Sequence, residues 1–168
     1  MSPEPTKLPL LDADSAAFLN SPVNSVNVAT RDAGNVPAVA RAQGCRVSDD
    51  RRRVTLLFPP SRSTDVLRNL RANGALAMAM TRPLTAQALQ LKGTVARIEP
   101  ATPEQRASVE PYRLAFAAEL ESLGYGREFA RGVVPPLEDE CIAVTFTPTA
   151  VFVATPGPNA GRKLGAES

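Results

Sequence analysis

Four consecutive residues, Ser61 to Thr64, have side chains that could bind an anion. Two serines, an arginine and a threonine stand there directly before residues 65–73, whose apolar spacing predicts a helix. The start of a helix presents unpaired N–H groups and the positive end of the helix dipole, so hydroxyl and guanidinium groups there would complete a phosphate site. The alternative is that Ser63 or Thr64 only caps the helix and that Arg62 is solvated. Most capped helices bind nothing, so this segment alone favours the cap.

A second polar group lies on the longest predicted strand, residues 87–98. Gln90 and Lys92 alternate there with apolar residues, so both point to one face, where they could hydrogen-bond a planar heteroaromatic ring or a phosphate. The same alternation is typical of any strand with a polar outer face, and this stretch alone favours that simpler interpretation. Gly93, in the middle of the strand, predicts a bulge or a close approach of another group to the backbone.

The chain contains no histidine, which excludes several kinds of enzyme. Ser-His-Asp and Cys-His nucleophile systems, HExxH metalloproteases and histidine-held haem all require that residue. Cys45 and Cys141 stand beside apolar residues and are expected to be buried free thiols, neither a disulfide nor a metal site. A redox cofactor, which brings its own reactivity, is the chemistry that best fits this composition.

Length and composition indicate one globular domain over residues 1–168, with a loose arm at 1–11 and an irregular tail at 155–168. The net charge of +2 and the aromatic content of 5% disfavour a nucleic-acid-binding module. No apolar run approaches the roughly 20 residues of a membrane helix, and no export signal precedes the domain. We therefore expect a cytoplasmic protein with neither a nucleic-acid nor a membrane partner. The basic pair Arg162-Lys163 in the tail could fold over a neighbouring subunit's site or bind nothing specific.

The order of predicted elements indicates a mainly β fold, an antiparallel barrel with a few short helices. Besides the helix and the long strand above, a helical region starts with a capping box at Thr102 and is expected to break in two at Pro111. The other expected helical segments are 13–19, capped by Asp12, and 126–131. The other expected strands are 23–30, 36–42, 44–47, 54–58 and 75–80, with a closing hairpin of 141–146 and 151–154 around Thr147-Pro148-Thr149.

Taken together, these elements resemble the FMN-binding split-barrel family of pyridoxamine 5'-phosphate oxidase. The resemblance is carried by the Ser25–Pro37 hairpin, the Ser-Arg-Ser-Thr loop and its helix, the strand of small residues, and the Gln-Leu-Lys-Gly strand. It covers roughly residues 18–100, with a similar strand pair and Thr-Pro-Gly-Pro tail near 141–161.

The resemblance implies a homodimer with two flavin sites at the subunit interface. The family's phosphate-binding loop matches Ser61 to Thr64, which implies that Ser61, Arg62, Ser63 and Thr64 hold the FMN phosphate. Contacts to the ring or ribityl chain would then come from Thr30, Gln90 and Lys92.

Three functions follow from the resemblance as expectations. The first is an FMN-dependent oxidoreductase whose substrate stays open, because the arginine and histidine pattern that binds substrate in pyridoxamine phosphate oxidase is missing here. A variant of this function uses a deazaflavin in place of FMN. The alternative, from a different class, is a dimer that binds flavin or another small molecule without catalysis and serves as a carrier or a sensor.

Overall fold

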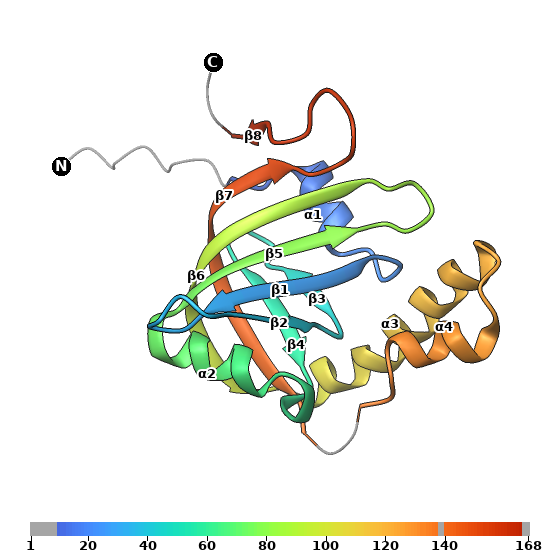
Figure 1. Ribbon diagram of the computed structural model, residues 1–168, viewed down its shortest axis with the longest axis horizontal. Helices are drawn as coiled ribbons and strands as arrows, with labels where there is room; N and C mark the ends of the chain where they lie inside the picture. Colours follow the sequence, from blue (N-terminus) through green and yellow to red (C-terminus); the bar gives the residue numbers. More distant parts are fainter. Residues whose placement is uncertain (1–9, 138–139, 166–168) are drawn as a thin grey trace.

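The computed structural model describes residues 10–137 and 140–165, which form eight strands, four α-helices and one 3-10 turn (Figure 1). The strands are β1 (Ser25–Arg31), β2 (Pro37–Arg41), β3 (Cys45–Val47), β4 (Val54–Phe58), β5 (Ala75–Thr81), β6 (Ala88–Pro100), β7 (Ile142–Val153) and β8 (Lys163–Leu164). The helices are α1 (Ala13–Leu19), η1 (Pro60–Arg62), α2 (Thr64–Asn73), α3 (Pro103–Ser122) and α4 (Arg127–Val133). None of the helices in these ranges is long and apolar enough to cross a membrane.

All eight strands belong to one antiparallel sheet with the order β2-β1-β5-β6-β7-β4-β3, and β8 pairs with β7. The sheet is strongly curved but does not close. β2 and β3 follow one another in the chain, yet they lie at opposite ends of the sheet and do not pair with each other. The link between them changes partners: the N–H of Ala42 donates to Val26 of β1, and the N–H of Gln43 donates to Leu57 of β4. The result is a barrel that is split between β2 and β3, which confirms the expected fold class.

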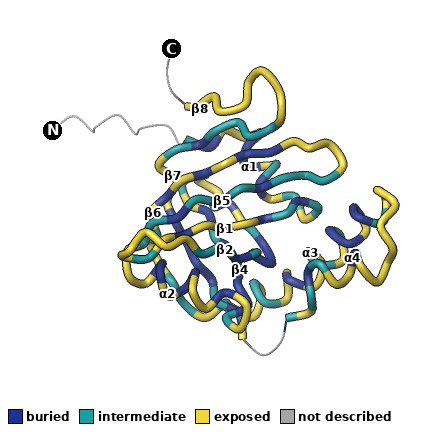
Figure 2. The backbone as a smooth tube through the Cα atoms, in the orientation of Figure 1, coloured by how far each residue is buried: buried dark blue, intermediate teal, exposed yellow. Residues whose placement is uncertain are grey.

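Buried residues alternate with more exposed ones along β1 and β5 (Figure 2), which places one set of their side chains inside the barrel. In β5, Leu76, Met78 and Met80 are buried, whereas the alanines between them are half-buried on the outer face. The inner side chains form one apolar core, to which Phe58 and Phe146 contribute the largest fully buried groups. Helix α2 packs against β1 and β2 and adds its own apolar face to this core.

Helix α2 is the element that positions the candidate anion site, and both of its ends follow from the sequence. Gly74 ends the helix at a φ of 69°, a left-handed conformation that favours glycine, and its N–H donates to Leu70. The Asn73 side chain donates to the carbonyl of Arg31 at 2.7 Å, and the Asn69 side chain donates to the Thr30 hydroxyl at 3.2 Å. These two bonds attach the helix to β1.

Most predicted elements are confirmed, including the Asp12 and Thr102 caps and the hairpins β1–β2 and β3–β4. The expected break at Pro111 is wrong, because α3 continues through it from Pro103 to Ser122. Proline removes one hydrogen bond to the carbonyl four residues earlier, that of Ala107. Both residues are exposed, so water can replace the missing donor.

The expected closing hairpin is also wrong, because residues 142–153 form one strand, β7, that pairs along its whole length with β6. Lys92 pairs with Ala150 and Gly93 with Pro148, so Thr149 is an extra residue in a bulge. A bulge accommodates Pro148, which has no N–H to donate. The tail is not wholly irregular either, since Lys163 and Leu164 form β8. Of the loose arm expected at 1–11, residues 1–9 lie outside the described part of the chain.

Gly93 is predicted to tolerate no side chain. A Cβ at this position would lie 2.3 Å from Cδ2 of Phe146 and 2.8 Å from the carbonyl oxygen of Thr147. We expect Gly93→Ala to lower the free energy of unfolding by about 1–3 kcal/mol, the usual effect of overpacking a rigid core. Chemical denaturation of both proteins measures the difference. Gly132→Ala is the matched control, because nothing lies within 4 Å of the point that its new methyl group would occupy, and a stability loss equal to that of Gly93→Ala would contradict the prediction.

Candidate functional site

A concave site of about 330 Å³ lies where η1 and the start of α2 meet the edge of β2. It is lined by Pro37 to Val39 of β2 and by Ser61 to Val66, so the whole predicted anion-binding loop borders it. We call this site the cradle. Its size falls at the lower end of the range for small-molecule sites.

Ser63 stands at the N-cap position of α2, but its hydroxyl does not cap the helix. Its backbone angles, φ −134° and ψ 18°, depart from the extended conformation that brings a capping oxygen over the first turn. The side chain is only 2% exposed, and Oγ forms no hydrogen bond with any described group. The expected N-cap position of Ser63 is therefore confirmed, but no side-chain capping bond forms. Thr64 is the first helical residue, and its hydroxyl donates to the carbonyl of Pro60 at 3.2 Å.

A buried hydroxyl without a partner is unfavourable by itself, and it fits the cradle if a ligand oxygen completes its hydrogen bonding. The first-turn N–H groups of a ten-residue helix have no partner inside the helix and attract negative charge. Asp65 adds a negative charge to this turn, but its carboxylate is paired with Arg68 at 2.9 Å. Arg62 is exposed beside the helix start and adds a positive charge. These groups together suit a phosphate.

Gln90 and Lys92 lie on the outer face of the sheet, as expected, and both are exposed. Cross-strand pairing places Ala79 beside Gln90, and Ala77 beside Lys92. On the other side of β6, Phe152 pairs with Gln90, and the Lys92 ammonium lies 5.7 Å from the centre of the Phe152 ring. The outer face therefore has small residues on β5, and polar and aromatic side chains beside them on β6 and β7.

Within a single chain, the cradle does not lie next to Gln90 and Lys92. The pairs Val39–Ala29, Ala29–Ala77 and Ala77–Lys92 form a row across β2, β1, β5 and β6, three strand spacings or about 14 Å in width. The cradle lies at the β2 end of this row and Lys92 at the β6 end. A ligand that touched both groups would have to extend along the outer face.

Thr30, the third expected ring contact, points into the barrel and is 6% exposed. Its hydroxyl accepts from Asn69 and lies 3.5 Å from the carbonyl of Ala38, to which it donates. The side chain thus supports α2 from inside, and a direct contact with a ligand stays a prediction.

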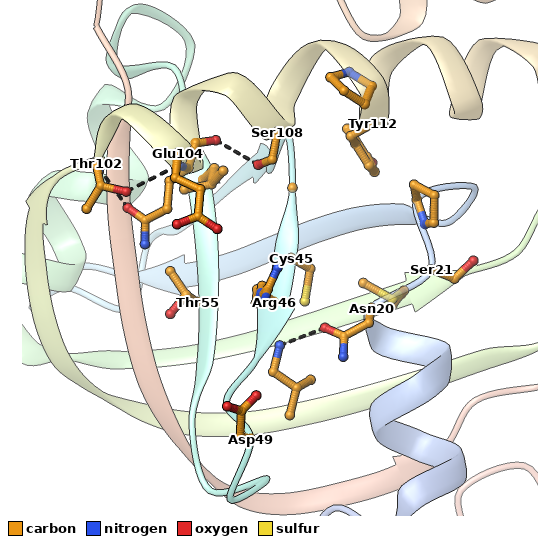
Figure 3. A pocket seen from close by; sticks show the side chains of 17 residues that line it. Asn20, Ser21, Cys45, Arg46, Asp49, Thr55, Thr102, Glu104, Ser108 and Tyr112 are labelled. Atoms are coloured by element: carbon orange, nitrogen blue, oxygen red, sulfur yellow. Dashed lines mark hydrogen bonds between the residues drawn. The ribbon is translucent and has the colours of Figure 1, made fainter.

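A larger cavity of about 850 Å³, which no sequence pattern indicates, lies between α3, the β3–β4 hairpin and the link from α1 to β1 (Figure 3). Its lining comes from segments far apart in the sequence, so no local pattern signals it. Cys45 and Tyr112 border this cavity, but burial raises the pKa of the Cys45 thiol to about 12 and also raises the pKa of the Tyr112 hydroxyl, which donates to Asn24. Both groups are therefore neutral near pH 7 and unsuited to nucleophilic catalysis.

Neither cysteine forms a disulfide, which confirms the expected free thiols, and Cys141 is buried. Among residues 10–137 and 140–165, no group of three or more histidine, cysteine or acidic side chains is arranged to hold a metal ion.

No protein-family model and no curated protein matches the sequence. Solved structures do match the fold. An F420 reductase is 19% identical with a TM-score of 0.54, covering 84% of this chain and 98% of its own. The HupZ protein of Group A Streptococcus is 18% identical with a TM-score of 0.53, covering 90% and 99%. A candidate pyridoxamine 5'-phosphate oxidase from Lactobacillus delbrueckii is 15% identical with a TM-score of 0.53, covering 85% and 93%.

At these identities the similarity concerns the fold, over nearly the full length of each neighbour. The chain thus has the split-barrel fold of the pyridoxamine 5'-phosphate oxidase-like proteins, as the sequence pattern indicated.

Proposed function

We propose that this protein binds FMN and acts as a flavin-dependent oxidoreductase. The observation that carries the proposal is the buried hydroxyl of Ser63, which has no hydrogen-bond partner among the described residues at the start of a ten-residue helix. The fold supports it, because similar structures include an F420 reductase and a candidate pyridoxamine 5'-phosphate oxidase.

The cradle holds the phosphate through the Ser63 hydroxyl, the Arg62 guanidinium and the backbone N–H groups of the first turn of α2, which begins at Thr64. The rest of the cofactor extends over the outer face toward Gln90 and Lys92, where the alanines of β5 let a flat ring approach the backbone. A bound flavin supplies the electron transfer. The chain's own residues bind and orient it. This role agrees with a composition without histidine, and with Cys45 and Tyr112, which stay neutral near pH 7.

A deazaflavin is the second candidate cofactor, favoured by the similarity to a protein described as an F420 reductase. Purified protein incubated with FMN or with the deazaflavin is separated from free cofactor, and the retained absorption spectrum identifies which one binds. Oxidation of a reduced nicotinamide by the loaded protein then distinguishes an enzyme from a carrier or sensor. Retention without turnover over a panel of electron donors would favour the non-catalytic dimer.

Ser63→Ala tests the observation that carries the proposal. The substitution removes a buried hydroxyl that has no partner, so the free energy of unfolding of the unliganded protein should stay unchanged or rise. FMN affinity should fall by about three- to tenfold, because one hydrogen bond to the phosphate is lost. Chemical denaturation and fluorescence titration measure the two effects. An unstable variant, or one with unchanged FMN affinity, would show that the hydroxyl serves the fold and not the ligand.

Arg62→Ala should weaken FMN binding by about ten- to a hundredfold, the effect of one charge-assisted contact to phosphate. Riboflavin, which lacks the phosphate, should bind both proteins equally. Arg52→Ala is the matched control, since Arg52 lies in the β3–β4 turn beside Asp49 and Asp50, away from the cradle. If Arg62→Ala and Arg52→Ala titrate alike with FMN, the phosphate is held elsewhere.

The proposal includes a homodimer formed through the outer face of β1, β5 and β6. Val39 at the edge of this face is 67% exposed, and the neighbouring outward residues of β1 and β5 are small, namely Ala29, Ala77 and Ala79. A second copy would cover this surface and the open edge of β2. The cofactor would then lie between two subunits.

Ala77→Arg should convert the dimer to a monomer, because it places a long charged side chain at the centre of the proposed interface. Light scattering after size-exclusion chromatography measures the mass without cofactor, and the wild-type mass should be twice 17.8 kDa. Ala107→Arg is the control, on the exposed surface of α3. A wild-type monomer at every protein concentration would remove the proposed dimer, and a dimeric Ala77→Arg protein would move the interface to another face.

A further inference from the structure

The larger cavity, about 850 Å³, lies at the open edge of β3 and shares no lining residue with the cradle. The first half of α3 forms one wall, and β3 with β4 forms the other (Figure 3). Apolar side chains border it from both faces of the sheet, with Met80 and Val47 on the barrel side and Leu57 on the side that faces α3. We call this cavity the edge cleft. Its volume lies within the range typical of small-molecule sites.

The backbone of β3 presents unused hydrogen-bonding groups to the edge cleft. Gly44 accepts from Leu57, and Arg46 pairs with Thr55, so both bond toward β4. Because backbone groups of successive strand residues point to opposite edges, those of Cys45 and Val47 point away from β4. The N–H of Val47 donates to the Asn20 side chain at 2.8 Å, whereas the N–H and C=O of Cys45 have no hydrogen-bond partner among the described residues.

The edge cleft also holds charges of both signs. Arg46 extends into it from β3 and Glu104 from α3, and Asp49 lies at its far end (Figure 3). None of the three forms an ion pair with another residue of the described ranges. Two of the lining hydroxyls, by contrast, already have hydrogen-bond partners. The Thr55 hydroxyl is bonded to that of Thr145 at 2.9 Å, and the Ser108 hydroxyl donates to the carbonyl of Gln105 at 2.7 Å. The groups that could bind a ligand include one cation, two carboxylates and an edge of backbone.

We propose that the edge cleft binds a short peptide with free termini, which adds as an extended strand to β3. The peptide backbone hydrogen-bonds to the N–H and C=O of Cys45, as in other complexes formed at a free sheet edge. Its carboxylate pairs with Arg46 and its ammonium with Glu104, which stand on opposite walls. An apolar side chain of the peptide packs against Leu57, on the side of the sheet that faces α3. This site does not depend on the proposed flavin site.

The test uses the tripeptide Ala-Leu-Ala, with free termini or with acetylated and amidated termini, titrated into the full chain with and without FMN. We expect saturable binding of the free tripeptide by calorimetry, and an affinity about two- to fivefold lower for Arg46→Ala and for Glu104→Ala, as for solvent-exposed ion pairs. The capped tripeptide should bind more weakly by a similar factor or more. Arg53→Ala, on the same hairpin but outside the cleft, should bind like the wild type.

Amide hydrogen exchange provides a readout specific to strand addition. The free tripeptide should slow exchange at the N–H of Cys45, and a tripeptide with N-methylated backbone nitrogens should bind more weakly. The proposal is overturned if no saturable binding occurs up to about 10 mM, a limit that corresponds to very weak affinity. It is equally overturned if capped and free tripeptides bind alike, or if the Arg46 and Glu104 variants retain wild-type affinity. The peptide test is independent of the flavin proposal. If Arg62→Ala loses FMN binding, the peptide affinities expected here do not change.

Discussion

The fit of Phe146 against Gly93 is the contact on which the rest of the structure depends. β6 and β7 join the two parts of the sheet, β2-β1-β5 on one side and β4-β3 on the other. Phe146 is fully buried at this junction and also pairs with Val54 of β4. A Cβ on Gly93 would overlap its ring, so the absence of a side chain lets the two strands come close. The register shifts beside Gly93 and Val95 bend both strands there, and bulges of this kind increase the twist of a sheet.

The same architecture explains why both candidate sites occur where they do. A curved sheet that does not close leaves two edge strands, and each edge borders a concave surface. The cradle lies between the edge of β2 and the start of α2. The edge cleft lies between the edge of β3 and α3. Backbone groups at a sheet edge lack partners, and natural proteins cover such edges or use them for binding.

The chemistry proposed for the protein agrees with the side chains that it has and lacks. Without histidine, and with Cys45 and Tyr112 kept neutral by burial, the two sites contain binding groups and few candidates for proton transfer near pH 7. An arrangement of this kind suits a cofactor whose own ring performs the electron transfer. The unsatisfied Ser63 hydroxyl is the observation from which we propose a ligand in the cradle.

The sequence by itself determined the local elements, because caps, turns and alternation act over a few neighbouring residues. The Asp12 and Thr102 caps, the Gly74 helix end and the outward position of Gln90 and Lys92 all follow from such patterns. Tertiary structure decided what depends on distant partners. β6 holds residues 142–153 in one strand, whereas local turn residues favoured a hairpin. Solvent around α3 tolerates Pro111, because water can replace the missing hydrogen-bond donor. The edge cleft has no local signature, because segments distant in sequence meet only after the sheet has curved.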